Sequence, residues 1–388
     1  MSVTSALGFR AAGVRAGIKA SGNHDVALVV NDGPSFVAAG VFTSNRFPAA
    51  PVLWSRQVLA DGEVRAVVLN SGGANACTGP DGFADTHRTA EHVAAVLTGQ
   101  GYEVGPGEVA VCSTGLIGER LPMIPLLDGI ERAAGALDAA GGADAALAIM
   151  TTDSVPKTAT VVAEGFTVGG MAKGAGMLAP GLATMLVVLT TDAVIDWAQA
   201  KAAVGQASTV TFDRIDSDGC MSTNDTVLLL ASGASGTTPP DDAFANAVTA
   251  VCADLARQLI GDAEGASKDI EVAVAGAASV DDALEVARAV TRSNLLKCAI
   301  HGEDPNWGRV LSAIGTTQAT FDPACVDVAI NGVWVCRGGM IGDDRGLVSM
   351  AGREVRIDID LHAGGEAASI WTNDLTAEYV HENSAYAT

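Results

Sequence analysis

The chain has 388 residues, of which 48% are hydrophobic, and this composition predicts a globular protein with two domains and enough apolar side chains for buried cores. Its 23 basic and 45 acidic side chains give a net charge of −22, which repels nucleic-acid phosphates and anionic lipid surfaces alike. We therefore expect no nucleic-acid partner.

The cysteines indicate a reducing compartment. Their number is odd and no C-x-x-C pair occurs, which favours reduced thiols over a disulfide framework. They stand at Cys77, Cys112, Cys220, Cys252, Cys298, Cys325 and Cys336. No segment approaches the ~20 apolar residues of a membrane helix, and the first residues lack the character of a signal peptide. We expect a cytoplasmic protein without a membrane span.

The first half of the chain predicts mixed α and β structure. Two apolar runs, 26–30 and 36–42, flank the turn formers Asn31-Asp32-Gly33-Pro34 and predict a hairpin over 26–43. Further strands are expected at 65–69 and 108–112. Apolar residues at helical spacing predict helices over 83–97 and 125–139, which would cover the sheet.

The second half continues the mixture. Strands are expected at 185–190, 226–231 and 269–275, and helices at 196–207 and 241–259.

Ser279-Val280-Asp281-Asp282 has the character of a capping box and predicts a helix start. Asn331-Gly332 predicts a tight hairpin between strands 326–330 and 333–336, and residues 355–361 alternate as a half-buried strand does. The sequence thus predicts an α/β (α+β) fold with much antiparallel pairing. We place a larger domain at 1–276 and a smaller α/β domain at 277–388.

The most informative segment is the run 173–186, KGAGMLAPGLATML, in which a glycine-rich loop delivers Thr184 into an apolar strand. Glycine permits the tight and left-handed backbone conformations that a bent loop needs. By composition alone, the run is also compatible with a structural loop before a buried strand, in which Thr184 is only a β-former.

Seven further blocks occur in order along the chain. They are NSGGANACTG at 70–79, CSTG at 112–115, MTTD at 150–153, STNDT at 222–226, EGASK at 264–268, DPNWGR at 304–309 and NSAYAT at 383–388. Together with the run 173–186, these blocks resemble the glutamate N-acetyltransferase (ornithine acetyltransferase) family of arginine biosynthesis. The resemblance covers nearly the whole chain.

The resemblance implies an αββα catalytic domain and self-cleavage between Ala183 and Thr184, giving an α chain of residues 1–183 and a β chain that begins at Thr184. It also implies a heterotetramer of two α and two β chains. After cleavage, the α-amine of Thr184 can act as base for its own hydroxyl, because an α-amine has a pKa of about 8. The resemblance assigns the oxyanion hole to Thr114 and Gly115.

By the same resemblance, the substrate contacts fall on Thr151, Lys173, Thr184, Glu264, Asn383 and Thr388. Lys173, Asn383 and Thr388 can donate to an α-carboxylate, whereas Glu264 can pair with the ammonium group of ornithine. The expected reaction is ping-pong transfer of acetyl from N2-acetylornithine to glutamate, without any cofactor. Whether acetyl-CoA also serves as a donor stays open.

The sequence contains two further glycine- or acid-rich stretches that are similar to ligand-binding loops. The stretch Asp216-x-Asp218-Gly219 is similar to part of a calcium loop, but Arg214 and Asp225 stand where ligands are needed, so we expect no metal. The residues 174–176 lack the context of a phosphate-binding loop. Two alternatives to the transferase remain: an amidase or aminopeptidase that uses the same Thr184 with water as acceptor, and a non-catalytic binding protein that stays uncut.

Overall fold

A computed structural model describes residues 2–179 and 185–385 of the chain. The chain divides into two compact units. The first comprises residues 2–213 and 220–262, apart from 180–184, and the second comprises 214–219 and 263–385. The segment 214–219 therefore belongs to the second unit, although the chain on both sides of it belongs to the first.

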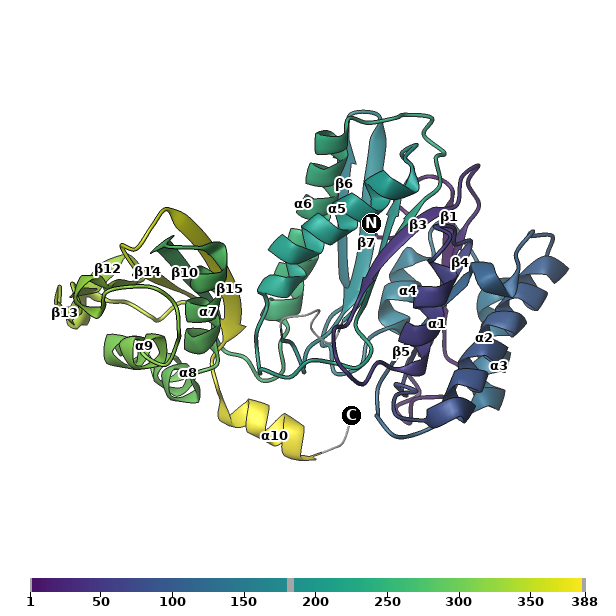
Figure 1. Ribbon diagram of the computed structural model, residues 1–388. Coiled ribbons are helices and arrows are strands. Elements are labelled where there is room, and N and C mark those ends of the chain that lie inside the picture. The colour runs from purple at the N-terminus through teal and green to yellow at the C-terminus, as the bar shows by residue number, and fades with distance from the viewer. Residues whose placement is uncertain (1, 180–184, 386–388) are drawn as a thin grey trace. The chain divides into compact units, whose positions relative to one another are not determined.

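The first unit contains two mixed sheets (Figure 1). One has the order β1-β2-β4-β5, with only β4 and β5 parallel. Its strands are β1 (Phe9–Val14), β2 (Val26–Asn31), β4 (Ala66–Ser71) and β5 (Val109–Thr114). The other has the order β3-β9-β8-β7-β6, with only β8 and β9 parallel. Its strands are β3 (Val37–Phe42), β6 (Lys157–Ala163), β7 (Phe166–Lys173), β8 (Leu186–Thr191) and β9 (Thr226–Ala231).

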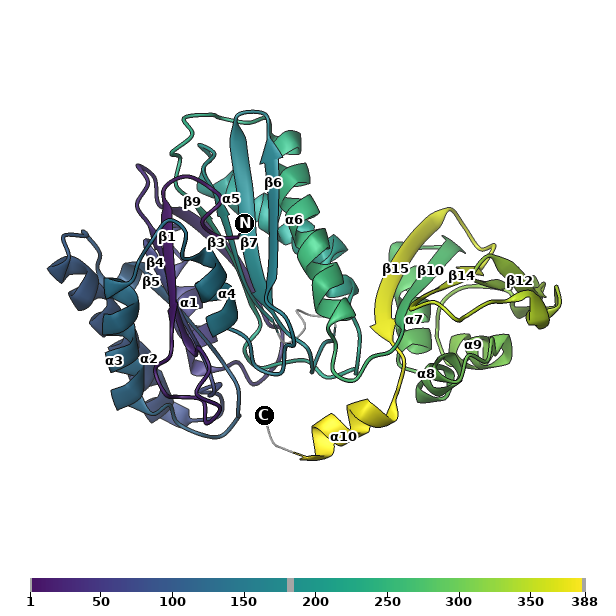
Figure 2. The same ribbon diagram turned by 180° about the vertical axis from the view of Figure 1, so that it is seen from behind.

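Helices cover the outer faces of these two sheets (Figures 1 and 2). The first sheet carries α2 (Gly79–Gly99) and α3 (Met123–Gly135), and the second carries α5 (Trp197–Val210) and α6 (Asp241–Gly261). Every residue of β2, β4, β5, β8 and β9 is buried, as expected of strands enclosed on both faces. The expected αββα layering of the first unit is confirmed.

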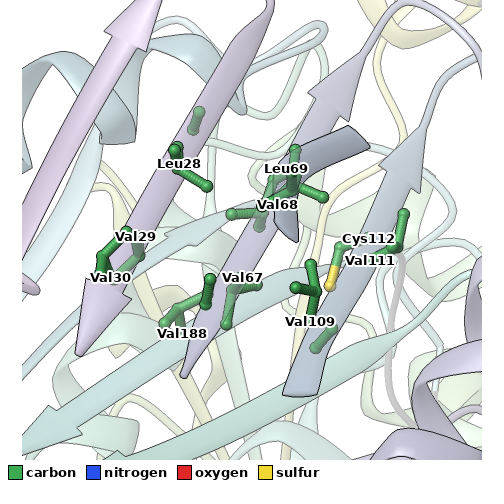
Figure 3. Close-up of a cluster of buried hydrophobic side chains, with 14 of the residues drawn as sticks. Leu28, Val29, Val30, Val67, Val68, Leu69, Val109, Val111, Cys112 and Val188 are labelled. Carbon is green, nitrogen blue, oxygen red and sulfur yellow. The ribbon is translucent and has the colours of Figure 1, made fainter. Parts of the chain in front are cut away.

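One apolar cluster of the described residues joins the two sheets. Side chains of β2, β4 and β5 form one buried cluster with Val188 of β8 (Figure 3). Each fully buried valine or leucine contributes roughly 1.5–3 kcal/mol relative to an exposed one. This core fixes β5 against β8, and with them the strand ends that carry the candidate catalytic residues.

The helix α1 (Ala50–Val58) closes the free edge of the first sheet. Ser55 Oγ donates to the Val111 carbonyl at 2.7 Å and accepts from the Val111 amide at 2.9 Å. Trp54 Nε1 donates to the Val109 carbonyl at 3.0 Å. Side chains thus replace the missing neighbour strand and satisfy buried backbone groups of β5.

The hairpin predicted over 26–43 is wrong. The strand β2 pairs with β1 and β4, whereas β3 pairs with β9 in the other sheet. The connecting turn runs so close to Ser232 that a Cβ on Gly33 would lie 2.3 Å from the Ser232 Cβ. Asn31 Nδ2 also donates to the Ala231 carbonyl at 3.2 Å. These contacts with the end of β9 lead the chain from one sheet to the other.

The second unit is built on a six-stranded mixed sheet of order β13-β12-β11-β14-β10-β15. Its strands are β10 (Asp269–Ala277), β11 (Asp327–Ile330), β12 (Val333–Arg337), β13 (Met340–Ile341), β14 (Glu354–Asp360) and β15 (Glu366–Asn373). The helix α7 (Val280–Thr291) packs on β10 and β15, and α8 (Asn294–His301) and α9 (Trp307–Ile314) pack against α7. The last described element is α10 (Ala377–Ala385).

Local signals of the second unit are confirmed. Asn331 and Gly332 both have positive φ, 46° and 81°, as the tight turn between β11 and β12 requires. Ser279 Oγ accepts from the Asp282 amide at 3.0 Å and caps α7. Buried residues alternate along β14.

The division between the units differs from the expected boundary at 276/277. The strand β10, which we assigned to the first domain, lies between β14 and β15 in the sheet of the second unit. The second unit therefore begins at residue 263 and adds the segment 214–219. Local periodicity identifies β10 as a strand but carries no signal of which sheet it joins.

The remaining elements of the described chain are short. They are α4 (Gly142–Ala148) in the first unit and 3₁₀ turns at Pro106–Glu108, Phe212–Arg214, Pro323–Cys325 and Arg345–Leu347. Across residues 2–179 and 185–385, no helix has both the length and the apolar character to cross a bilayer.

Candidate active site

The carboxyl end of β5 forms a rigid turn at Thr114 and Gly115. The Thr114 carbonyl accepts hydrogen bonds from the amides of Gly72, at 2.9 Å, and Gly73, at 3.0 Å. Gly115 has a φ of +131°, and a Cβ there would lie 2.5 Å from the Gly73 nitrogen. Both facts require glycine at this position. The Thr114–Gly115 peptide is therefore held by the neighbouring loop.

Buried side chains stabilise this turn through hydrogen bonds. Asn224 Nδ2 donates to the carbonyls of Ser113, at 2.8 Å, and Ala74, at 2.7 Å. Ser113 Oγ donates to Asn70 Oδ1 at 2.6 Å, and Asn70 Nδ2 donates to the Gly73 carbonyl at 3.1 Å. Sequence blocks 70–79, 112–115 and 222–226, which come from both sheets, thus form one network.

Lys173 ends β7 and brings a positive charge to this turn. Its side chain is only 2% exposed, and Nζ donates to Thr114 Oγ1 at 3.4 Å. In the register of β7 and β8, Lys173 lies opposite Leu186. The chain that follows Thr184 therefore enters its strand next to Lys173.

Asp153 is a fully buried carboxylate that faces two lysines. Its Oδ1 lies 2.7 Å from Lys157 Nζ, and its Oδ2 lies 4.0 Å from Lys173 Nζ. The amides of Gly174, at 2.6 Å, and Thr151, at 2.9 Å, also donate to it. Burial raises the pKa of Asp153, but the two lysine charges and the hydrogen bonds outweigh burial and lower the pKa to about 2. This carboxylate positions Lys173 and the backbone of Thr151.

A second buried carboxyl group, Asp225, immediately precedes β9 and contacts the residue before β8. Its Oδ1 accepts from the Met185 amide at 3.1 Å. Burial raises its pKa well above the ordinary value, although Met185, Ser222, Lys173 and Thr43 all oppose this shift. Asp225 therefore holds the first described residue after Thr184.

The second unit contributes a separate polar cluster. Asn383 Nδ2 on α10 donates to Glu264 Oε2 at 2.9 Å. A Cβ on Gly265, whose φ is +61°, would lie 2.2 Å from the Tyr379 nitrogen, so glycine allows this loop to approach α10. Glu264 and Tyr379 also line a cavity of about 210 Å³ within this unit.

The stretch Asp216-x-Asp218, which is similar to part of a calcium loop, contains a carboxylate that forms an ion pair. Asp216 Oδ2 lies 2.7 Å from Arg292 Nε and thus already faces a cation. Within the described ranges, which omit 180–184 and the last three residues, histidine, cysteine and acidic side chains form no cluster of three or more that could hold a metal.

Comparison with known proteins identifies the family. The model of the ArgJ family matches residues 10–388. The chain belongs to the ArgJ family. It is 68% identical over 387 residues to the arginine biosynthesis bifunctional protein ArgJ of Streptomyces avermitilis, and 62% identical over 388 residues to that of Thermobifida fusca. Each alignment covers 100% of both chains.

A solved structure of the family shares 61% identity with the part of this chain that it matches. It is the ornithine acetyltransferase of Mycobacterium tuberculosis complexed with ornithine, with a TM-score of 0.46. The match covers 48% of this chain and 96% of that chain. Membership of the ArgJ family confirms the resemblance found in the sequence and the acyltransferase class that it implies.

The structure places the predicted catalytic and substrate-binding residues of this ArgJ-family chain in two groups. Thr114, Gly115, Thr151 and Lys173 lie in the first unit, connected through Asp153 and the direct contact of Lys173 with Thr114. Glu264 and Asn383 contact each other in the second unit. Ala183, Thr184 and Thr388 lie outside the described residues.

Sequence reasoning missed Asp153 and Asp225. Both stand in blocks that the family resemblance singled out, MTTD and STNDT, but an acidic residue in a motif gives no signal that it is buried. One local signal was available for Asp153, since Lys157 follows it at a spacing of four residues.

Proposed function

We propose that this ArgJ-family protein transfers an acetyl group from N2-acetylornithine to glutamate, after cleaving its own chain between Ala183 and Thr184. The observation that carries the proposal is the position of Lys173, which contacts Thr114 at the end of β5 and pairs in register with Leu186, two residues after Thr184. The proposal places the reaction in the cytoplasm, in a heterotetramer of two α and two β chains.

Cleavage would create the catalyst. Thr184 Oγ attacks the Ala183 carbonyl, the acyl group moves from nitrogen to oxygen, and water then hydrolyses the ester. The products are the Ala183 carboxylate and a free α-amine on Thr184. Before cleavage this nitrogen is an amide, which cannot accept a proton at neutral pH, whereas the free amine has a pKa of about 8 and can act as a base.

Acetyl transfer would then follow in two half-reactions. The Thr184 amine takes the proton of Oγ as Oγ attacks the acetyl carbon of N2-acetylornithine, and that proton passes to the departing amine of ornithine. The α-amine of glutamate next attacks the acetyl ester and restores the Thr184 hydroxyl. Because an amide is made from an amide, no cofactor is needed.

Thr114 and Gly115 are suited to stabilise the oxyanion of each half-reaction. Lys173 donates to Thr114 Oγ1, so the hydroxyl hydrogen of Thr114 can point to another acceptor, and the nearby positive charge polarises it. The two hydrogen bonds that the Thr114 carbonyl accepts hold the Thr114–Gly115 peptide plane, and with it the direction of the Gly115 N–H. Loss of one such donor costs typically 10²- to 10³-fold in rate.

The substrate contacts proposed from the family resemblance are Thr151, Lys173, Thr184, Glu264, Asn383 and Thr388. Lys173 and Asn383 are donors for the α-carboxylate, and Glu264 is an acceptor for the ornithine ammonium. The name of the relatives, bifunctional protein, is consistent with a second donor, for which acetyl-CoA is the candidate.

The test begins with denaturing electrophoresis and mass spectrometry of the purified protein. Cleavage after residue 183 of the 388-residue chain gives fragments of 183 and 205 residues, the second beginning Thr-Met-Leu. Thr184→Ala should remain whole. Active protein of full length would contradict the proposal.

The acceptor is then identified with N2-acetylornithine labelled in the acetyl group. The transferase gives labelled N-acetylglutamate only when glutamate is present. Labelled acetate at the same rate without glutamate would instead identify an amidase. Replacing the donor by labelled acetyl-CoA tests the second activity.

A further inference from the structure

The proposed reaction places opposite demands on the part of the site that binds the substrate side chain. Ornithine ends in an ammonium group, whereas glutamate ends in a carboxylate. The Glu264 carboxylate attracts the ornithine ammonium. It repels the side-chain carboxylate of glutamate, because two like charges at short range raise the free energy. A site that accepts both substrates in turn needs a cation as well.

The cavity of about 210 Å³ in the second unit contains both kinds of charge. Its lining includes Asp218, Glu264, Lys297, Asp374 and Tyr379. All of these residues belong to the second unit, which includes the segment 214–219. The cavity therefore combines carboxylates with one buried ammonium group.

Lys297, on α8, is held without a carboxylate partner. It is 6% exposed, and its Nζ donates to the Ser217 carbonyl and, at 3.3 Å, to Thr372 Oγ1. Within the described chain, no acidic side chain lies within 4.0 Å of its Nζ. An ammonium group has three donors and is costly to bury without an opposite charge. Burial accordingly lowers the pKa of Lys297, against the opposing charges of Asp218, Asp216 and Asp374.

The other buried lysines of the described residues differ from Lys297 in this respect. Lys157 and Lys173 face Asp153, at 2.7 and 4.0 Å, and Lys268 faces Glu303 at 3.0 Å. Their charges are compensated inside the protein, whereas the charge of Lys297 faces neutral acceptors and a cavity. An anionic ligand group would supply the missing compensation.

Asp374 is already committed to other donors. The amides of Ser267 and Lys268 each donate to its Oδ1 at 2.9 Å, and His301 Nδ1 lies 2.9 Å from its Oδ2. Although burial opposes ionisation, these hydrogen bonds lower the pKa of Asp374. Glu264, which is half-buried, is the acidic group of this cavity that the proposed function assigns to the ligand ammonium.

We propose that Lys297 binds the side-chain carboxylate of glutamate in the second half-reaction, within the same cavity in which Glu264 binds the ammonium group of ornithine. This inference rests on the proposed function. Departure of ornithine removes a positive charge from the cavity, and glutamate then places its carboxylate beside the Lys297 ammonium, which donates hydrogen bonds to neutral acceptors. Lys297 is thus a residue that determines specificity for the acceptor.

Lys297 also has a structural contact, since its bond to the Ser217 carbonyl ties the segment 214–219 to α8. The experiment must therefore distinguish charge recognition from support of this segment. Glutamine is the suitable probe, because it has nearly the same shape as glutamate without the charge. A structural defect lowers kcat/KM equally for glutamate and glutamine. Loss of charge recognition lowers kcat/KM for glutamate relative to that for glutamine.

The experiment compares cleaved wild-type protein with Lys297→Gln, Lys297→Arg and the exposed control Lys201→Gln. Release of ornithine from N2-acetylornithine measures the first half-reaction, and acetyl transfer to glutamate or glutamine measures the second. We expect Lys297→Gln to lower the kcat/KM preference for glutamate over glutamine roughly 10- to 100-fold, with ornithine release within about 3-fold of wild type. Lys297→Arg should keep most of the preference, and Lys201→Gln should keep all of it.

Three results would overturn the inference. One is equal losses in both half-reactions of Lys297→Gln, and another is an unchanged preference for glutamate in that variant. The third needs no variant, so it applies even if Lys297→Gln does not fold: wild-type protein that uses glutamine as well as glutamate. If wild-type protein transfers no acetyl from N2-acetylornithine to either acceptor, the proposed function itself fails. If it transfers acetyl but one of the three results is found, only the inference about Lys297 fails.

Discussion

Replacing Asp153 by asparagine tests whether its charge organises the site of the first unit. Asp153 lies between Lys157 and Lys173, at 2.7 and 4.0 Å from their Nζ atoms, and its side chain is 0% exposed. Asparagine keeps the shape of the side chain and one acceptor for the Gly174 amide. It removes the negative charge that both buried lysines face.

The expected loss of stability has a component that depends on pH. Folding lowers the pKa of Asp153 from 3.8 to about 2, and this shift corresponds to about 2 kcal/mol of stability at neutral pH. Because the folded pKa is depressed, this stability is present above the unfolded pKa and is lost as pH falls through the folded value; about half remains at pH 3. Removing one partner of a buried ion pair costs roughly 3–5 kcal/mol in all.

The measurement is urea unfolding of wild type, Asp153→Asn and the exposed control Asp128→Asn at pH 7, 5 and 3. Peptide-resolved hydrogen exchange of β7 assigns the transition to the first unit. We expect Asp153→Asn to unfold with a free energy lower by roughly 3–5 kcal/mol at pH 7, and the difference should shrink by about 1 kcal/mol at pH 3. A difference that is the same at pH 7 and pH 3 would refute the electrostatic reasoning.

Three further changes have distinct outcomes. Gly115→Ala places a Cβ 2.5 Å from the Gly73 nitrogen, so transferase kcat should fall roughly 10²- to 10³-fold. Gly118 also has a positive φ, but a Cβ there would meet no atom within 4 Å, so the control Gly118→Ala should keep its activity. Ser55→Ala leaves the buried amide and carbonyl of Val111 unpaired, and its free energy of unfolding should fall by roughly 1–3 kcal/mol in urea titrations. Asp225→Asn should gain stability relative to wild type as pH rises above about 4, because the raised pKa makes wild-type stability decline from the unfolded pKa upward. A stability difference that does not change with pH would contradict this.

The sequence predicted those elements whose signals are local. Alternating burial in β14, the Asn331-Gly332 turn and the Ser279 cap all depend on a few neighbouring residues, and all three are present. The hairpin over 26–43 failed because β2 and β3 are uniform apolar runs, which indicate strands but not their partners. The pairing of β10 with β14 and β15 is non-local in the same way.

The residues of the candidate site also differ in whether the sequence alone indicates them. Motif resemblance led to Thr114, Gly115 and Lys173, and the structure brings them together at the end of β5. Asp153 and Lys297 were not found, because the property that distinguishes each is burial beside a charge or a cavity. Burial of a charged residue is created by tertiary packing and leaves no pattern in the adjacent sequence.

The net charge of −22 explains why such residues matter for an anionic substrate. The net charge repels an anion that approaches the protein, and salt at about 0.1 M screens this repulsion beyond about 10 Å. Attraction must therefore come from cations at short range, where low dielectric strengthens it. Of the buried lysines in the described chain, Lys157 and Lys268 lie within 3.0 Å of carboxylates. Lys297 has no carboxylate within 4.0 Å of its Nζ among the described residues, which is the property on which its proposed role in binding a substrate carboxylate depends.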